Sequence, residues 1–266
     1  MKMLVTVIAL ASLLIPLSLL AQEKGVAKGK DASKPAPVQQ VNVSGTWETQ
    51  NEGFYPRMRQ TGNMVTGKTY KGPPTFVRGG WSQDHLVLVI NWKPEDPAKC
   101  ERTIFVGEKK KTATRLEGGW FRNGAIVFDA LNRVSADIGE PVTYPYAAEL
   151  RACGDLTTYE LAFDVGSAAL NDPSALILTA VAELLKQDQA LKLRVIGHTD
   201  STGNAAKNKE LSLQRAESVK KRLVELATLD AARIATEGMG QEQPIADNAS
   251  AAGRALNRRV EIAIAR

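Results

Sequence analysis

The sequence predicts an α+β protein, in which an N-terminal all-β antiparallel barrel or sandwich precedes a C-terminal domain of order β-α-β-α-β-β with a mixed sheet. Residues 42–155 hold 13 of the 15 aromatic residues and many glycines. Residues 156–266 are instead rich in Ala and Leu and alternate between strand-like and helix-like patterns. The composition, 44% hydrophobic and 24% charged over 266 residues, is that of globular proteins and excludes a wholly disordered chain.

Residues 1–21 resemble a secretory signal peptide, because Lys2 is followed by an uncharged apolar run that ends near the small residue Ala21. An uncleaved membrane anchor is the alternative, since about 20 apolar residues can span a bilayer. Both interpretations place the rest of the chain outside the cytoplasm. Residues 22–41 carry Lys and Pro without apolar periodicity, which predicts a flexible linker.

Within residues 42–155, short β-branched and aromatic runs are separated by Gly and Asn turns, which predicts an antiparallel sheet closed into a barrel or sandwich. Glycine precedes or nearly precedes Trp in three segments, and strand-like runs lie between them: Val43–Trp47, Val77–Trp81 and Leu116–Trp120, with His85–Trp92 and Ala125–Phe128. We expect the glycines to permit close approach of a neighbouring backbone or ring. The tryptophans are expected in the core of this domain.

The sequence of the β-domain has two other interpretations. A transmembrane barrel needs a lipid-facing apolar row on each strand, but Arg57, Arg59, Lys68 and Lys71 interrupt the candidate strands. The sequence therefore favours a soluble domain. A barrel with a pocket for a small molecule or glycan is also compatible with the sequence, although no residue pattern selects a ligand.

The C-terminal domain is expected to pack its helices on one face of its sheet. The apolar face of its first helix, which opens at Asp172-Pro173, is predicted to comprise Ile177, Val181, Leu184 and Leu185. The second helix is predicted over Asn204–Leu226. The strands are predicted over Leu161–Val165, Leu193–Gly197, Arg233–Glu237 and Arg259–Ile264.

Opposite charges converge where the second strand of this domain ends. Asp200 follows the strand, and Arg215 lies on one face of the following helix with Asn208 and Ser212. Two interpretations fit this arrangement. Asp200 and Arg215 pair with each other, or they bind a zwitterion together, Asp200 taking the ammonium group and Arg215 gripping the carboxylate.

The motifs of this domain occur in a characteristic order: Phe163-Asp164, Gly197-His198-Thr199-Asp200, Asn208-x-x-Leu211-Ser212-x-x-Arg215, Gly238-Met239-Gly240 and Asn257-Arg258-Arg259-Val260-Glu261. In these motifs, over about 110 residues, the chain resembles the OmpA-like peptidoglycan-binding domain family. The resemblance implies noncovalent binding of the diaminopimelate residue in the stem peptide of the cell wall. It makes Asp200 and Arg215 the two ligating residues, with Thr199, Asn208 and Arg258 lining the pocket. Asp164 is carried over as well, although the residues after it vary among relatives.

Cys100 and Cys153 are a candidate disulfide, because disulfides persist outside the cytoplasm; two buried free thiols are the alternative. No cluster of metal-ligating residues appears in the sequence, and we expect neither metal nor cofactor. His198 and Asp200 lie two residues apart on one strand beside Ser201, whereas a triad needs His to bridge the other two groups in space. We therefore expect no enzymatic activity.

The net charge of +5 does not indicate nucleic-acid binding, because residues 156–266 carry 14 basic and 14 acidic residues. The leading hypothesis is an exported, periplasmic or outer-membrane-associated protein that binds peptidoglycan and tethers its β-domain to the wall. Residues 42–155 would meet an outer-membrane or other envelope partner. One alternative is a wall tether anchored in the inner membrane, like flagellar stator proteins. The other is an enzyme whose β-domain acts on wall glycans or peptides, which no motif supports.

Overall fold

The structure of the protein is a computed structural model. It describes residues 42–265 except for positions 52, 73–74, 92–99, 101, 110–113, 162, 164–165 and 171–174. The chain divides into residues 1–37 and a compact unit of residues 38–266. The predicted signal peptide, the predicted linker, Asp164 and the start of the helix at Asp172-Pro173 lie outside the described residues. No helix among the residues described is long and apolar enough to cross a membrane.

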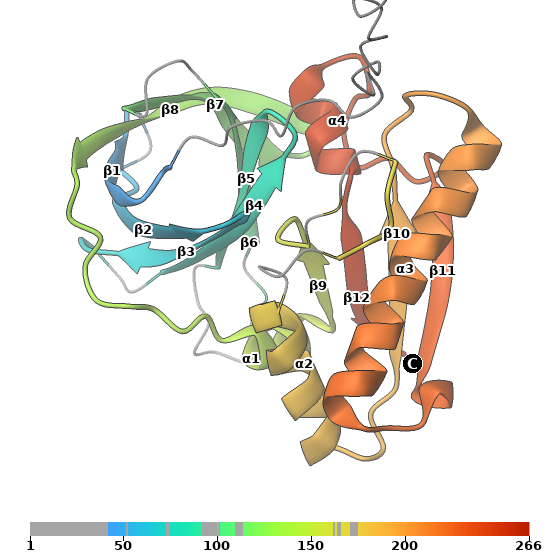
Figure 1. The fold of residues 1–266 in the computed structure, drawn as a ribbon. Helices are drawn as coiled ribbons and strands as arrows, with labels where there is room; N and C mark the ends of the chain where they lie inside the picture. The colour runs from blue at the N-terminus through green and yellow to red at the C-terminus, as the bar shows by residue number, and fades with distance from the viewer. Residues whose placement is uncertain are drawn as a thin grey trace, which may run out of the picture. The chain divides into compact units, whose positions relative to one another are not determined.

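Eight antiparallel strands close into a barrel, as the sequence predicts (Figure 1). Each strand pairs with the next, and the last pairs with the first. The strands are β1 (Gly45–Thr49), β2 (Pro56–Thr61), β3 (Met64–Thr69), β4 (Phe76–Ser82), β5 (His85–Asn91), β6 (Arg102–Lys109), β7 (Arg115–Arg122) and β8 (Ala125–Ser135).

Large apolar side chains fill the barrel interior. Trp47 and Trp120 are almost fully buried there, and Trp81 is only 5% exposed, so the prediction of core tryptophans is confirmed for these three. The ring of Trp120 meets Phe105 edge-on at 5.4 Å between centroids, an arrangement that aromatic quadrupoles favour. The predicted close approaches are present as well, because a Cβ at Gly118 would meet a backbone carbonyl of the neighbouring strand β6.

The C-terminal sheet has the strand order β11-β10-β12-β9 and is mixed, as predicted. Only β10 and β11 pair in parallel. Its strands are β9 (Asp155–Thr158), β10 (Leu193–His198), β11 (Ile234–Gly240) and β12 (Val260–Ile264), and its helices are α2 (Ala175–Gln187), α3 (Ala205–Ala227), the 3-10 turn η3 (Ala231–Arg233) and α4 (Ala251–Asn257). The apolar faces of α2 and α3 share one core with these strands, and the four residues predicted for the face of α2 are all buried in it.

The strand predicted over Leu161–Val165 lies partly outside the described residues, at positions 162, 164 and 165. The edge strand of the sheet is β9, which pairs with β12 and places Leu156 and Thr158 inward. Phe163 forms only an isolated bridge with Leu170. The four residues of β9 carry no apolar run, because a short edge strand needs few buried side chains. Periodicity therefore could not find it.

A short helix, α1 (Tyr146–Cys153), joins the barrel to the C-terminal sheet. It precedes residue 156, where the sequence suggests that the second domain starts, yet Tyr146 and Leu150 lie in the core that α2 and α3 cover. The Cys100–Cys153 disulfide ties the end of α1 to the chain just before β6, with 4.9 Å between the Cα atoms. The disulfide prediction is thereby confirmed.

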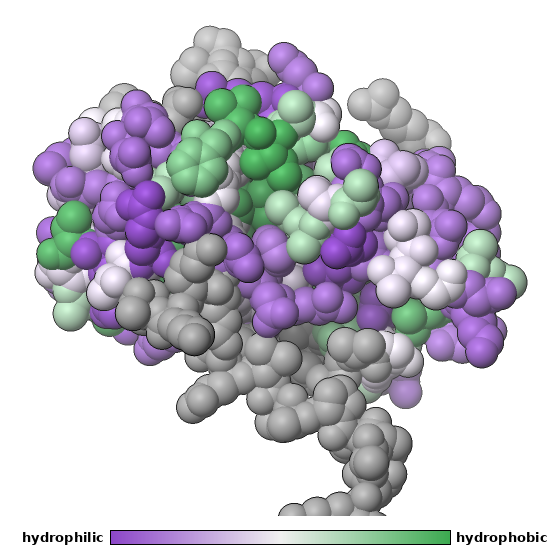
Figure 2. All heavy atoms as spheres, turned by 90° about the horizontal axis from the view of Figure 1, so that it is seen from above, coloured by the Kyte–Doolittle hydropathy of each residue, from purple (hydrophilic) through white to green (hydrophobic). Residues whose placement is uncertain are grey.

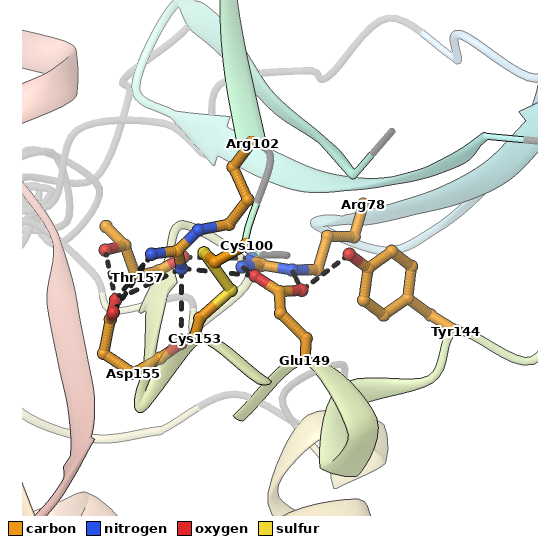
Figure 3. The surroundings of a disulfide bond; sticks show 8 residues. All are labelled: Arg78, Cys100, Arg102, Tyr144, Glu149, Cys153, Asp155 and Thr157. Atoms are coloured by element: carbon orange, nitrogen blue, oxygen red, sulfur yellow. Dashed lines mark hydrogen bonds and ion pairs between the residues drawn. A yellow bond between two sulfur atoms is a disulfide. The ribbon is translucent and has the colours of Figure 1, made fainter. Parts of the chain in front are cut away.

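Buried ion pairs surround this junction (Figure 3). Arg78 of β4 is fully buried and donates to Glu149 of α1 at 2.7 Å and to Glu160 at 2.9 Å. Tyr144 donates to the same Glu149 carboxylate at 2.6 Å. Arg102 of β6 reaches both Glu149 and Asp155. Strands β4 and β6 are therefore held to residues 144–160 by charge-assisted hydrogen bonds, of which those of Arg78 are fully buried.

The outer face of β5 and β6 packs against the C-terminal part of the chain. Val87, Val89 and Val106 form one cluster with Tyr159 and with Ala255 and Leu256 of α4. Figure 2 shows apolar atoms gathered between polar ones on the face seen from above. On β8, Val127 and Phe128 remain exposed.

Candidate functional site

The site begins where β10 ends, and glycine is required just before that end. Helix α3 crosses β10 so closely that a Cβ at Gly197 would collide with the backbone carbonyl of Ser212. Gly203 then turns the chain with a φ of 92°, a conformation that favours glycine. Asn204 caps α3 by accepting a hydrogen bond from the backbone N–H of Lys207 at 3.1 Å. The start of α3 is thus returned beside the strand end.

Asp200 is only 7% exposed, and both of its carboxylate oxygens accept hydrogen bonds. Oδ1 accepts the backbone N–H of Thr202 at 2.8 Å, and Oδ2 accepts Nη1 of Arg258 at 2.6 Å. Burial alone would raise the pKa of Asp200, but the hydrogen bonds from Arg258 and Thr202 lower it below its ordinary value. Asp200 is therefore an anion at neutral pH.

Arg215 lies on α3 with its guanidinium over the ring of Phe163, 5.0 Å from the centroid. Its Nε donates to the backbone carbonyl of Ser167 at 3.0 Å. Burial and the positive charge of Arg258 lower the pKa of Arg215, and the negative charge of Asp200 opposes that effect. A guanidinium stays protonated under such shifts, so Arg215 remains a cation near Asp200 and Arg258.

Asn208 and Thr199 hold the loop between strand and helix. The Asn208 amide donates to the backbone carbonyls of Asp200 and Thr202 and to Oε1 of Gln241, at 3.3, 3.0 and 3.0 Å. Thr199 donates its hydroxyl to the carbonyl of Asp200 at 2.8 Å, and its N–H to the carbonyl of Gly240, also at 2.8 Å. Both side chains are at least nine-tenths buried, so they buttress the loop rather than offer a free surface.

The partner of Asp200 is Arg258. One interpretation of the sequence pairs Asp200 with Arg215, but no hydrogen bond or ion pair joins these two residues in the structure. The carboxylate is bonded instead to Arg258, which follows α4. Arg258 lowers the pKa of Asp200, and the charges of Arg258 and Asp200 act in opposite directions on the pKa of Arg215. Of the predicted site residues, five come together here, and Asp164 lies outside the described residues.

Three residues that the sequence did not single out as site residues also take part. Ser82, from the barrel, accepts hydrogen bonds from Arg258 at its hydroxyl and at its carbonyl, at 3.1 and 3.0 Å. Phe163 and the carbonyl of Ser167 contact Arg215. Phe163 belongs to a recognised motif, which could have indicated it. No sequence signal could have indicated Ser82, because it is 176 residues from Arg258 in the chain.

His198 is buried beneath the site, and neither ring nitrogen forms a hydrogen bond with a described residue, while Nε2 lies 3.5 Å from Oε1 of Glu261. Burial, with the nearby charge of Arg259, lowers the pKa of His198 to about 3. The ring is therefore neutral at physiological pH and is not bonded to the neighbouring Ser201. Within the described ranges, no group of three or more His, Cys, Asp or Glu side chains is placed to hold a metal ion.

Residues 162–258 match the OmpA family model. The chain is similar to the "Probable lipoprotein YiaD" of Escherichia coli, with 48% identity over 102 residues that cover 38% of this chain and 46% of that protein. It is also similar to the "Peptidoglycan-binding protein ArfA" of Mycobacterium bovis, with 39% identity over 126 residues, 47% of this chain and 38% of the other. The chain thus spans less than half the length of these curated relatives.

Among solved structures, the chain is similar to the peptidoglycan-associated lipoprotein from Burkholderia pseudomallei, with 27% identity and a TM-score of 0.37 over 43% of this chain and 92% of the other. The family match falls on the segment that carries Thr199, Asp200, Asn208, Arg215 and Arg258. The C-terminal part of the chain is an OmpA-like domain.

Proposed function

We propose that this is an exported cell-envelope protein that binds peptidoglycan noncovalently at the diaminopimelate of the stem peptide. The observation that carries the proposal is the placement of the buried anion Asp200 and the cation Arg215 in one site without a bond between them. Diaminopimelate carries an ammonium and a carboxylate on one carbon. A carboxylate and a guanidinium that are not joined to each other are complementary to those two groups.

Each part of the site has a chemical task in this binding. Asp200 accepts the ligand ammonium while Thr202 and Arg258 keep its carboxylate ionised. Arg215 receives the ligand carboxylate, since its Nε is held by the carbonyl of Ser167 while its Nη atoms donate to no described residue. Hydrogen bonds to charged groups contribute about 1.5–3 kcal/mol each. A single site therefore binds modestly, and the many repeated sites of a wall increase retention.

Three observations support a location in the envelope. The disulfide is typical of an oxidising compartment. The relatives include, by name, a probable lipoprotein and outer-membrane proteins. The first 21 residues have the composition of an export signal. In this proposal the protein acts by binding, without catalysis, and its barrel is the element held at the wall, where it meets another envelope component.

Co-sedimentation of the full-length protein with purified sacculi tests the proposal. Asp200→Ala and Arg215→Ala should each remove the protein from the pellet while the circular dichroism spectrum stays that of the wild type. Arg194→Ala is the matched control, because Arg194 is an exposed strand arginine paired with Glu237 away from the site, and it should sediment like the wild type. Sedimentation of both site variants at wild-type levels would refute the assignment.

A further inference from the structure

The barrel reaches into the candidate site through the hairpin that joins β4 to β5. Ser82 is the last residue of β4 and pairs with His85, the first residue of β5. Its side chain is 9% exposed. The hydroxyl of Ser82 donates to the backbone carbonyl of Ala255 in α4 at 3.2 Å, so the hairpin and α4 are bonded directly beside the site.

Arg258 spans the distance between this hairpin and Asp200. Its Nε and Nη2 donate to the hydroxyl and the carbonyl of Ser82, while Nη1 donates to Oδ2 of Asp200. All three nitrogens of the planar guanidinium are therefore engaged at once. Because the group is rigid, fixing two of its nitrogens on Ser82 fixes the direction in which the third points.

We propose that Ser82 is a positioning residue of the stem-peptide site, which aims Arg258 at Asp200 and so makes the barrel a structural part of the wall-binding pocket. The proposal rests on the proposed function and extends it beyond the OmpA-like segment. A free Arg258 would rotate among many side-chain conformations. Preorganisation by Ser82 spares the ligand that ordering cost when it binds.

Titration of the full-length protein with meso-diaminopimelate, followed by calorimetry, tests this role. Ser82→Ala removes the hydroxyl and leaves the carbonyl bond, so binding should weaken about three- to tenfold. Ser82→Thr keeps a hydroxyl at the same position and should restore most of the affinity. Gln83→Gly is the control, because Gln83 is the exposed neighbour with a positive φ of 57° that glycine adopts readily, and its affinity should equal that of the wild type.

A double-mutant cycle separates positioning from a general effect on folding. If Ser82 acts through Arg258, Ser82→Ala should cause no further loss in an Arg258→Ala background. Equal losses in both backgrounds, or wild-type affinity of Ser82→Ala, would overturn the inference. Failure of the proposed function looks different, because then the wild type would not bind, or Asp200→Ala would bind as tightly as the wild type.

Discussion

At the scale of single residues, Arg78 is a fully buried cation that pairs with the equally buried carboxylates of Glu149 and Glu160. Burial would lower the pKa of Arg78, but the two carboxylates outweigh it and raise that pKa. The same Arg78 lowers the pKa of Glu149 against the effect of burial. These charges are tolerated only together, since removal of one partner leaves the others as uncompensated charges at fully buried positions.

Replacement of Arg78 is therefore expected to be severe. Arg78→Met should reduce the free energy of unfolding by about 3–5 kcal/mol, because two buried carboxylates lose their counter-charge. Chemical denaturation at pH 7 measures the change. Arg194→Met is the comparison, since the exposed pair of Arg194 with Glu237 should contribute little. Comparable losses in the two variants would contradict the argument from burial.

His198 predicts a dependence of stability on pH. In the unfolded chain its pKa is near 6.5, and in the folded protein it is about 3, so only the unfolded state binds the proton between these values. Stability from the neutral ring is present above pH 6.5 and is lost as the pH falls toward 3, by about 1 kcal/mol per pH unit. Burial lowers the pKa of His85 as well, which adds a slope of the same sign.

Denaturation at a series of pH values between 6.5 and 5 measures this slope, in a range where the carboxylates are still ionised in the unfolded chain. His198→Gln should show a shallower slope than the wild type, and His85→Gln gives the share of the other histidine. A His198→Gln slope as steep as that of the wild type would show that His198 does not titrate on unfolding.

At the scale of elements, a helix or strand could be predicted from the sequence when it buries many side chains in a regular pattern. The long helix α3 and the strand β10 were predicted nearly to their ends, because each repeats its apolar residues over a sufficient length. The short elements β9, α1 and α4 were missed, since tertiary contacts stabilise them. The candidate pair Asp200 and Arg215 was identified through its motif. The barrel's contribution to the site was not, because it depends on packing that no local pattern records.

The disulfide joins the chain just before β6 to the end of α1. It closes a loop with a sequence separation of 53, for which the loss of chain entropy in the unfolded state is worth up to about 4 kcal/mol. Reduction should therefore lower the melting temperature measured by calorimetry. The Cys100→Ser/Cys153→Ser double variant should melt at that lower temperature whether or not reductant is present. An unchanged melting temperature of the wild type on reduction would contradict this role.

At the scale of the whole molecule, the barrel and the OmpA-like domain share contacts of several kinds: the disulfide, the Arg78 ion pairs and the apolar contact of α4 with β5 and β6. Gly80 adds a close approach, because a Cβ there would meet the backbone carbonyl of Tyr159. Such interlocking contacts make separate unfolding of either part costly. Residues 42–265 should behave as one cooperative unit rather than as two independent domains.

Thermal unfolding of the oxidised protein should therefore give a single calorimetric transition, with equal calorimetric and van't Hoff enthalpies. Near-ultraviolet circular dichroism follows the barrel tryptophans. Far-ultraviolet dichroism at 222 nm follows helices that lie mainly in the OmpA-like domain. The two signals should change at the same temperature. Two resolved transitions would show that the interface is weaker than its buried contacts indicate.

The position of Cys100 and Cys153 also determines how the molecule carries a mechanical load. The backbone leaves the barrel after β8 and enters the OmpA-like domain through α1, and the disulfide adds a second covalent route from the chain before β6 to the end of the same helix. A pull on the barrel is therefore shared by two covalent connections. Extension of the single backbone segment between β8 and α1 cannot separate the barrel from the OmpA-like domain, because the disulfide also joins them. Tension on the barrel is therefore transmitted directly to the OmpA-like domain.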